Sequence, residues 1–373
     1  MMRLPTYGLL SSCTDRRFWR RPETENAPYR LSFGALGRAG NRAHARVSAS
    51  ARLTQRGPLN IIRPRALRGK AMTDTTKSTA TDHEMAITVR AIEPADGDEC
   101  ARIVYDAFGA IQDRHQFPRD FPTFEAAVQL TSNFIAHPAI WGVVAEADGR
   151  ILGSNFLDER GSITGVGPIT VDPKAQGHGV GRRLMEAVME RGARARGIRL
   201  FQDSFNMQSL SLYASLGFEV KEPAVVMNGT PRSEFPAGIE VRPLKDSDLE
   251  QCEQLCLTVH GFERTNELRD ALQIPVFSPS VALRDGRITA YATTLTFFPA
   301  AYAVAETEED MRALITGTLA AGDEPASLLV PTRQTSLFQW CLSEGLRAVK
   351  PMTYMAIGEY RDPDGCWIPS VLY

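Results

Sequence analysis

The sequence predicts an α/β fold built on a mixed β-sheet, and two observations carry this prediction. An apolar, β-rich stretch at residues 163–171 turns through glycines directly into a helix, which the spacing of its apolar residues extends to about residue 196. A second strand, at residues 198–203, is followed at once by a second short helix. This alternation is typical of helices packed on a sheet.

The surrounding elements extend the same plan. Residues 87–92 alternate as a strand, and a helix begins after Pro94. Residues 141–146 and 150–157 form a hairpin through an Asp-Gly turn, and a last strand lies near residues 219–227. The predicted order of elements is therefore β-α-β-β-β-α-β-α-β.

Composition and length define the broad class of protein. The 373 residues are 43% hydrophobic and 23% charged, which is ordinary for globular domains and leaves room for two of them. No stretch reaches the roughly 18 to 20 apolar residues of a membrane span, so we expect no membrane association. The six cysteines form no C-x-x-C pair and have no histidines at ligand spacing, so we expect reduced thiols, no metal and a cytoplasmic protein.

The first part of the chain differs from the rest in charge. Residues 1–71 hold 15 basic and three acidic residues, a net charge of +12. We expect the whole basic segment, residues 1–85, to be disordered. Its composition fits an organellar transit peptide, a nucleic-acid-binding arm, or translated sequence upstream of a true start at Met72. We favour the last, because the segment has no amphipathic helix and no regularly spaced aromatic residues for bases, and we expect no nucleic-acid partner.

The turn after residues 163–171 is suited to holding a phosphate. Its alternate glycines, Gly177, Gly179 and Gly181, let the backbone approach a ligand beside the first free amides of the helix. The helix dipole adds to the attraction for an anion. The spacing excludes a dinucleotide loop, because Arg182 stands where G-x-G-x-x-G needs its third glycine, and it excludes a P-loop, which needs Gly-Lys-Ser/Thr.

Two motifs around this turn point to a family. Gln176, Gly179 and Gly181 fit Q-x-x-G-x-G, and residues 206–218 fit N-x-x-[A/S]-x-x-L-Y-x-x-x-G-F at every spacing. In these motifs the sequence resembles the GNAT superfamily of acetyl-CoA-dependent N-acyltransferases, over residues 86–228. The resemblance implies the GNAT fold with a splayed fourth strand, and acetyl-CoA as co-substrate with its pyrophosphate on the glycine turn.

The resemblance also implies which residues contact the cofactor. Backbone amides of the splayed strand hold the thioester and the pantetheine arm, the turn holds the pyrophosphate, and the start of the second helix contacts the arm. The implied cofactor-binding residues are Ile169, Thr170, Val171, Gln176, Gly177, His178, Gly179, Val180, Gly181, Arg182, Asn206 and Ser209. Simpler roles are open for three of them: Asn206 as a helix cap only, His178 as a solvent-exposed residue, and Arg182 as a surface cation.

The catalytic candidates follow from what acyl transfer to an amine needs: a neutral nucleophile, a polarised carbonyl and a protonated leaving thiolate. The resemblance makes Tyr213 the general acid, and a tyrosine pKa near 10 puts proton donation to a thiolate only about 2 kcal/mol uphill. Its simpler role is packing beneath the sheet. Residues 163–171 offer no ionisable side chain as a base, so Asp203 and Glu159 are the candidates, and either is alternatively a plain surface carboxylate.

Residues 239–373, after a linker at 229–238, repeat the plan in faint form. Residues 239–248 echo 87–96, and residues 336–346 parallel the second motif without its tyrosine. No Q-x-x-G-x-G precedes the corresponding helix. We interpret this half as a degenerate GNAT-like domain in tandem with the first; an unrelated α/β domain is the alternative. Two such halves pack as the subunits of a dimer would, in a monomer or in a homodimer.

These inferences predict an N-acetyltransferase that transfers an acetyl group from acetyl-CoA to a primary amine by direct attack in a ternary complex. The acceptor is a small molecule or a peptide, and residues 112–124, with mixed basic and aromatic side chains, help to shape its pocket. The alternative is a catalytically silent CoA-binding sensor or scaffold. Tyr213 is present in the first half and has no counterpart in the second, which favours the enzyme.

Overall fold

The computed structural model describes residues 86–232 and 238–372. Its first half follows the predicted order of elements, except that a second helix, which the sequence analysis did not predict, lies between the first two strands and that the predicted strand at residues 163–171 is split. Short 3-10 turns precede α1 and follow α3. The elements are β1 (Thr88–Ala91), α1 (Gly97–His115), α2 (Phe124–Ala136), β2 (Ile140–Ala147), β3 (Arg150–Asp158), β4 (Ile163–Val166), β5 (Thr170–Val171), α3 (Val180–Arg191), β6 (Gly197–Asp203), α4 (Met207–Ser215) and β7 (Glu219–Gly229).

The second half repeats this order up to its penultimate strand, but it has no counterpart of β5. It consists of β8 (Glu240–Pro243), α5 (Leu249–His260), α6 (Thr265–Gln273), β9 (Ser280–Arg284), β10 (Arg287–Ala292), β11 (Ala303–Ala305), α7 (Glu308–Ala320), β12 (Ala326–Pro331), α8 (Thr335–Ser343), β13 (Arg347–Gly358) and an extra strand, β14 (Cys366–Ile368).

One ion pair recurs in both halves with the same geometry. Arg90 on β1 donates to Asp96 with N···O distances of 2.7 and 2.9 Å, and Arg242 on β8 donates to Asp248 with distances of 2.7 and 2.9 Å. Each aspartate also accepts an amide hydrogen bond of 2.8 Å from the residue three positions before it. The faint sequence echo therefore coincides with a repeated local structure.

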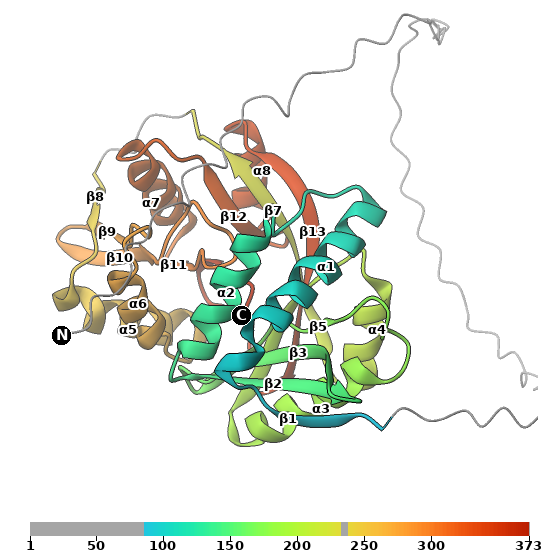
Figure 1. Ribbon diagram of the computed structural model, residues 1–373. Helices are drawn as coiled ribbons and strands as arrows, with labels where there is room; N and C mark the ends of the chain where they lie inside the picture. Colours follow the sequence, from blue (N-terminus) through green and yellow to red (C-terminus); the bar gives the residue numbers. More distant parts are fainter. Residues whose placement is uncertain (1–85, 233–237, 373) are drawn as a thin grey trace, which may run out of the picture. The chain divides into compact units, whose positions relative to one another are not determined.

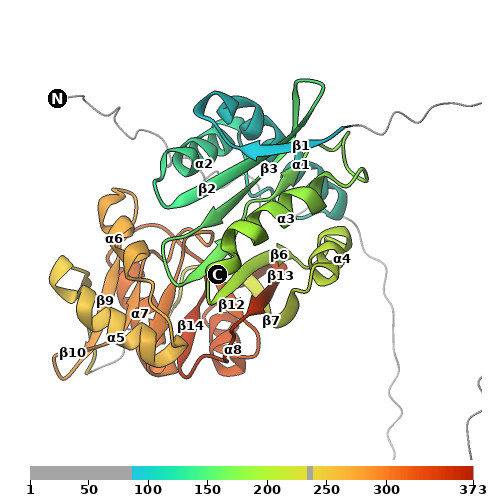
Figure 2. The ribbon, with the colours of Figure 1, turned by 90° about the horizontal axis from the view of Figure 1, so that it is seen from below.

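The two halves exchange their last strands. The larger sheet has the order β1-β2-β3-β4-β6-β13-β7-β12, with β5 paired to β3, and the smaller sheet has the order β14-β11-β10-β9-β8. Strand β13 of the second half lies between β6 and β7 of the first, and β7 pairs in turn with β12 (Figures 1 and 2). The predicted linker thus separates two segments of sequence, while their strands interleave in one sheet.

The exchanged strands meet around an approximate two-fold axis. β7 and β13 run antiparallel, and Met352 faces Ala224. Both residues follow a proline directly, Pro351 and Pro223, so they occupy equivalent places in the two halves. This equivalence relates each half of the sheet to the other.

The core of the first half lies on both faces of its part of the sheet. Helices α1 and α2 cover one face, and α3 and α4 cover the other (Figure 2). The α3 and α4 side includes the buried side chains of Leu184, Val188, Leu200 and Phe218. Burial of apolar area at about 25 cal/mol per Å² is the main force that holds these layers together.

The predicted strand at residues 163–171, which two glycines and a proline interrupt, consists of two short strands. β4 pairs in parallel with β6 only from Ile163 to Gly165, and β5 pairs only with β3 in the described sheet. The backbone turns away at Gly167, where φ is +139°, which suits glycine alone. The edge of β6 beyond residue 199 and the facing edge of β5 are therefore left apart, as the resemblance implied.

Three expectations concern other parts of the chain. The basic segment at residues 1–85 and residues 233–237 of the predicted linker lie outside the described residues. Among the helices that the structure describes, none is long and apolar enough to span a bilayer. The five cysteines of the described ranges are buried and form no disulfide, and those ranges contain no cluster of metal-ligating side chains.

Candidate functional site

The glycine turn between β5 and α3 is anchored by Asp172. Its Oδ1 accepts a hydrogen bond from the Lys174 amide and its Oδ2 accepts one from Arg102 of α1, both at 2.9 Å. Burial opposes ionisation of this carboxyl, yet the two donors hold the pKa of Asp172 below its usual range. Gly177 and Gly179 have φ values of +84° and +82°, and a Cβ on either would meet no atom within 4 Å. The turn therefore needs glycine for its backbone conformation and has open space beside it.

Helix α3 begins at this turn with uncapped amides. Gly179 is the N-cap and provides no side-chain hydrogen bond, and the first turn contains no acidic residue. Arg182 lies in that turn and donates to Ser215 Oγ of α4 at 2.6 Å, so it also ties α3 to α4. A helix start with free amides and a cation attracts an anion through its dipole and its N–H groups.

The other predicted residues of the turn lie along the same opening. Thr170 and Val171 form β5, and Ile169 precedes them. Gln176 donates from Nε2 to the Val171 carbonyl at 3.3 Å, which closes the turn. His178 is exposed, with Nδ1 at 3.1 Å from the Gln176 carbonyl. Val180 is buried, and Gly181 lies where a Cβ would come within 3.4 Å of Leu212.

The start of α4 is fixed to the end of β6. Asn206 caps the helix by accepting a hydrogen bond of 3.2 Å from the Ser209 amide. Ser209 in turn donates from Oγ to Gln202 of β6 at 2.7 Å. Because β4 and β6 are parallel, their carboxyl ends face the same edge of the sheet. The α4 start and the glycine turn therefore lie at one edge.

Tyr213 is buried on the side of the sheet that α3 and α4 cover. It is 6% exposed and belongs to the same apolar cluster as Leu184 and Phe218. Burial and, second, the charge of Asp203 hold the pKa of Tyr213 well above its ordinary value. The Tyr213 hydroxyl is thus protonated at neutral pH and responds electrostatically to Asp203.

Asp203 lies at the end of β6 and points to the opposite face. Alternation along the strand directs Leu200 and Gln202 toward α3 and α4, and Phe201 and Asp203 toward the face of α1 and α2. Asp203 Oδ1 accepts a hydrogen bond of 2.7 Å from Lys350 Nζ on β13, and Lys350 Nζ also donates to Asp120 Oδ2 at 2.6 Å. These three side chains form the acidic cluster.

The charges of the acidic cluster perturb one another. Burial raises the pKa of Asp203 above its ordinary value, although the Lys350 ammonium group opposes this rise. Burial lowers the pKa of Lys350, but the Asp120 and Asp203 carboxylates outweigh it and leave that pKa raised. Asp203 is therefore a stronger base than an ordinary aspartate, and Lys350 stays charged.

The structure does not bring Glu159 to this place. Its carboxylate receives two hydrogen bonds of 2.9 Å from Arg191, the last residue of α3. The glycine turn lies at the other end of α3, and Glu159 lies near the start of β4, opposite the edge where Asp203 lies. Of the two predicted bases, only Asp203 lies near Tyr213.

Sequence reasoning missed Lys350 and Asp120. The segment at residues 112–124 does reach the acidic cluster, because its loop after α1 carries Asp120, whose amide donates to Gln112 Oε1 at 3.0 Å. Lys350 comes from a strand that lies 147 positions further along the chain than Asp203. No local motif marks it; only the strand exchange places it there.

A separate small pocket lies between the halves, away from the glycine turn. Its walls include Arg199, His260, Tyr354 and Trp367. Arg199 and Ile163, also in its lining, belong to the first residues of β6 and β4, whereas the glycine turn follows the far end of these strands. This pocket is therefore separate from the site at the glycine turn.

The splayed strands β4 and β5 and the glycine turn that leads into the uncapped start of α3 lie in a segment that matches a known protein family. Residues 138–220 match the family model "Acetyltransferase (GNAT) domain". This segment of the chain, which includes the glycine turn and α3, is therefore similar to GNAT acetyltransferase domains.

Solved structures share this fold across both halves. A putative acetyltransferase from Pyrococcus horikoshii aligns with a TM-score of 0.59 and 14% identity, over 78% of this chain and 97% of that one. The GCN5-related glucosamine N-acetyltransferase region of a fungal multi-domain β-N-acetylglucosaminidase aligns with a TM-score of 0.52 and 12% identity, over 73% of this chain and 38% of that one. At these identities the likeness shows the fold alone. A comparison with curated protein sequences gave no match.

Proposed function

We propose that the protein is an N-acetyltransferase that transfers an acetyl group from acetyl-CoA to a primary amine. One observation carries the proposal: the opening between β5 and β6 has the uncapped start of α3 at its edge, Tyr213 on one face and Asp203 on the other. Donor-binding groups, an acid and a base thus surround one gap in the sheet.

The donor half of the proposal rests on the turn and the strand edge. The amides at the start of α3 would receive the pyrophosphate of CoA, beside the open space at Gly177 and Gly179. The unpaired edge of β5, at residues 169–171, would hold the pantetheine arm and the thioester carbonyl through backbone amides. Acetyl-CoA supplies the acetyl group as a thioester.

The proposed reaction uses three proton transfers within the site, and Asp203 then releases its proton to solvent. An ammonium acceptor gives a proton to Asp203, directly or through one water, and the neutral nitrogen then bonds to the thioester carbonyl carbon. As the carbon–sulfur bond breaks, Tyr213 gives its proton to the thiolate, and it takes a proton back from the nitrogen. The products are the acetamide, CoA and one proton, which Asp203 releases to solvent.

The raised pKa of Asp203 favours its proposed role as a base, whereas the raised pKa of Tyr213 opposes its proposed role as an acid. A higher pKa makes Asp203 a better acceptor of the ammonium proton. A higher pKa makes Tyr213 a weaker acid, so donation to a free thiolate costs more than the roughly 2 kcal/mol expected for an ordinary tyrosine. Binding of the thioester next to Tyr213 changes its surroundings, and donation takes place in that complex.

The acceptor lies on the face of α1 and α2 in this proposal, because Asp203 points there. A small-molecule or peptide amine fits an acidic cluster whose two carboxylates outnumber its one ammonium group. A cytoplasmic monomer with two interleaved halves completes the proposal. The alternative is a catalytically silent CoA-binding sensor or scaffold. The second half has no glycine turn, but this absence argues only for the silence of the second half and not for that of the first.

Turnover by the full chain tests the proposal. We expect release of free CoA from acetyl-CoA in a panel of polyamines, aminoglycosides, amino acids and peptides with free N-termini. Replacing Tyr213→Phe removes the acid with little change in packing, and we expect kcat to fall about 10- to 100-fold with unchanged affinity for CoA. CoA binding without turnover on the whole panel would establish the silent alternative.

A further inference from the structure

The acidic cluster contains a buried cation that the second half contributes. The Lys350 side chain is 2% exposed, and Nζ lies 2.6 Å from Asp120 Oδ2 and 2.7 Å from Asp203 Oδ1. The three residues come from β13, from the loop between α1 and α2, and from β6. One ammonium group between two carboxylates leaves the cluster with an excess negative charge.

General stability is a weak explanation for such a cluster. Removing charged groups from water costs several kcal/mol for each ion, and apolar side chains of similar volume commonly do as well. The neighbours of Lys350 are indeed apolar on one side, where the Phe298 ring centre lies 5.3 Å from Nζ. A polar cluster inside this environment therefore calls for a second role.

The approximate two-fold axis allows the Lys350–Asp203 pair to be compared with the equivalent positions of the second half. Lys350 precedes Pro351 on β13, and the equivalent residue on β7, which precedes Pro223, is Glu222. Asp203 pairs with Met352 across the sheet, and its equivalent, which pairs with Ala224, is Pro331. The equivalent site therefore has a glutamate in place of the lysine and a proline in place of the aspartate, and it lacks the ion pair.

We infer that Lys350, supplied by the second half, is a positioning residue of the first half's acetyl-transfer site, where its ammonium group holds the Asp203 carboxylate in place to accept the amine proton. This inference rests on the proposed function. It gives the second half a task in the reaction: β13 completes a site whose cofactor turn lies entirely in the first half.

The electrostatics agree with this assignment. The charged or titratable groups that act on Asp203 are Lys350 of β13, Asp120 of the loop after α1 and Tyr213 of α4. Burial and Asp120 raise the pKa of Asp203, whereas Lys350 lowers it. Loss of the Lys350 charge would therefore leave Asp203 protonated over a wider pH range, and unable to act as a base there.

The test compares Lys350→Met with Lys350→Arg in the full chain. Titration of Asp carboxyl carbons by ¹³C NMR, with the Asp203 signal assigned by its loss in Asp203→Asn, follows ionisation without any acceptor. CoA release from acetyl-CoA with each amine of the panel gives the pH profile. Glu222→Gln is the matched control at the equivalent place. Where Lys350→Met does not fold, Asp120→Asn combined with Lys350→Met removes the cation and the second carboxylate together.

We expect Lys350→Met to raise the titration midpoint of Asp203 by at least about one pH unit and to lower kcat roughly tenfold at pH 7, with KM for acetyl-CoA within about twofold. The acid limb of the profile should shift by the same amount, and Lys350→Arg should restore most of it. An unchanged Asp203 midpoint, or an unshifted acid limb in a folded and active variant, would overturn the inference. Absence of turnover in the unaltered chain, with an intact NMR shift, would instead refute the proposed function.

Discussion

The starts of α3 and α7 occupy equivalent places in the two halves and have opposite chemistry. α3 follows a turn with two glycines at positive φ, has no side-chain cap and carries Arg182 in its first turn. α7 follows Thr307, whose hydroxyl accepts a hydrogen bond of 3.2 Å from the Asp310 amide, and its first turn carries Glu308, Glu309 and Asp310. The first start can receive a phosphate, whereas the second has a capped amide and repels anions.

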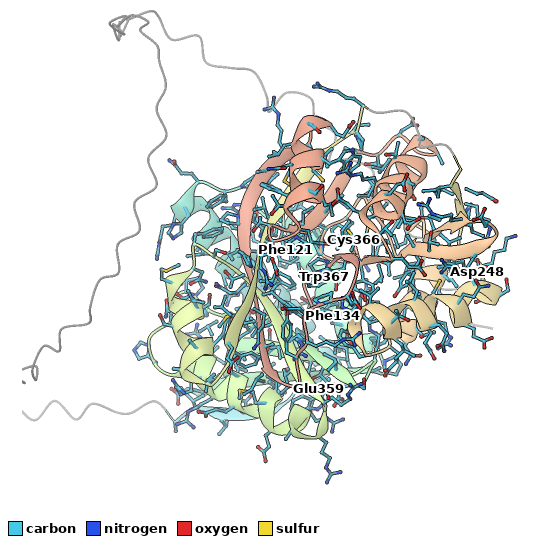
Figure 3. The ribbon with its side chains drawn as sticks, turned by 180° about the vertical axis from the view of Figure 1, so that it is seen from behind. Phe121, Phe134, Asp248, Glu359, Cys366 and Trp367 are labelled. Atoms are coloured by element: carbon cyan, nitrogen blue, oxygen red, sulfur yellow. The ribbon has the colours of Figure 1, made fainter. Side chains whose placement is uncertain are left out.

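The gaps beside these helices differ in the same way. In the first half, the edges of β5 and β6 are left apart. In the second half, β14 pairs with β11, and Gln334 at the start of α8 exchanges hydrogen bonds of 2.6 and 2.9 Å with the Trp367 backbone. Cys366 and Trp367 of β14 lie near the middle of the molecule in Figure 3. An open hollow remains beside Gln334 and Cys366, and Glu306 and Glu308 line it.

This difference fits the proposal that the first half holds the donor site and that the second half acts as a structural support. The repeated ion pairs Arg90–Asp96 and Arg242–Asp248 show how similar the two frameworks are. The glycine turn, the open strand edge and the acidic cluster, by contrast, occur together only in the first half of the described chain.

Asp203→Asn should have the largest effect, because it removes the proposed base and leaves the shape of the side chain. We expect kcat to fall about 10²- to 10⁴-fold, and the acid limb of the pH profile to disappear. Steady-state kinetics from pH 5 to 9 measure both. Glu159→Gln is the matched control, since its carboxylate pairs with Arg191 at the other end of α3, and its kinetics should stay within about twofold. Equal losses in both variants would refute the assignment.

Trp367→Ala should damage the filled gap of the second half without touching the donor site. The Trp367 side chain is 4% exposed and packs against Tyr354 and His260. We expect a loss of about 3–5 kcal/mol in the free energy of unfolding, measured by chemical denaturation. The CoA dissociation constant of the folded variant should be unchanged, and a large loss of CoA affinity would contradict the division of roles.

Acidification should weaken the same region through His260. Burial lowers the pKa of His260 to about 3, so between pH 6.5 and about 3 the unfolded chain binds a proton that the folded chain does not. Stability is therefore lost as the pH falls through this window, by about 2 kcal/mol at pH 5. His260→Phe should remove this part of the loss. Chemical denaturation of the unaltered chain and of His260→Phe at pH 7 and pH 5 measures this difference. The same loss of stability in both proteins would contradict the role given to His260.

Gly179→Ala should have the smallest effect, about tenfold in the CoA dissociation constant, because the added methyl group enters the open space where the proposal places the pyrophosphate. Alanine at positive φ also costs about 1 kcal/mol of stability. Gly286→Ala is a close control: Gly286 has a φ of +76° in the β9–β10 hairpin and also has no atom within 4 Å of an added Cβ. Both variants should lose similar stability, but only Gly179→Ala should lose affinity. Equal CoA affinity of Gly179→Ala and Gly286→Ala would show that the glycine turn does not contact CoA.

The local parts of this account could be predicted from sequence, and the distant ones could not. The glycine turn, α3 and α4 were predictable because turn chemistry and helical periodicity act over a few residues. The interruption at Gly167 was indicated by glycine and proline within the strand. The strand exchange was not, because β7 and β13 carry prolines that argue against central strands, and pairing between distant strands has no local signal. Lys350 was missed for that reason.

The central claim is that the chain has one donor site, at the glycine turn of the first half. Isothermal titration of the full chain with CoA tests it most directly. The account predicts one CoA bound per chain, with weaker binding in Gly179→Ala and unaltered binding in Gly286→Ala. Two CoA molecules per chain, or none, would contradict it.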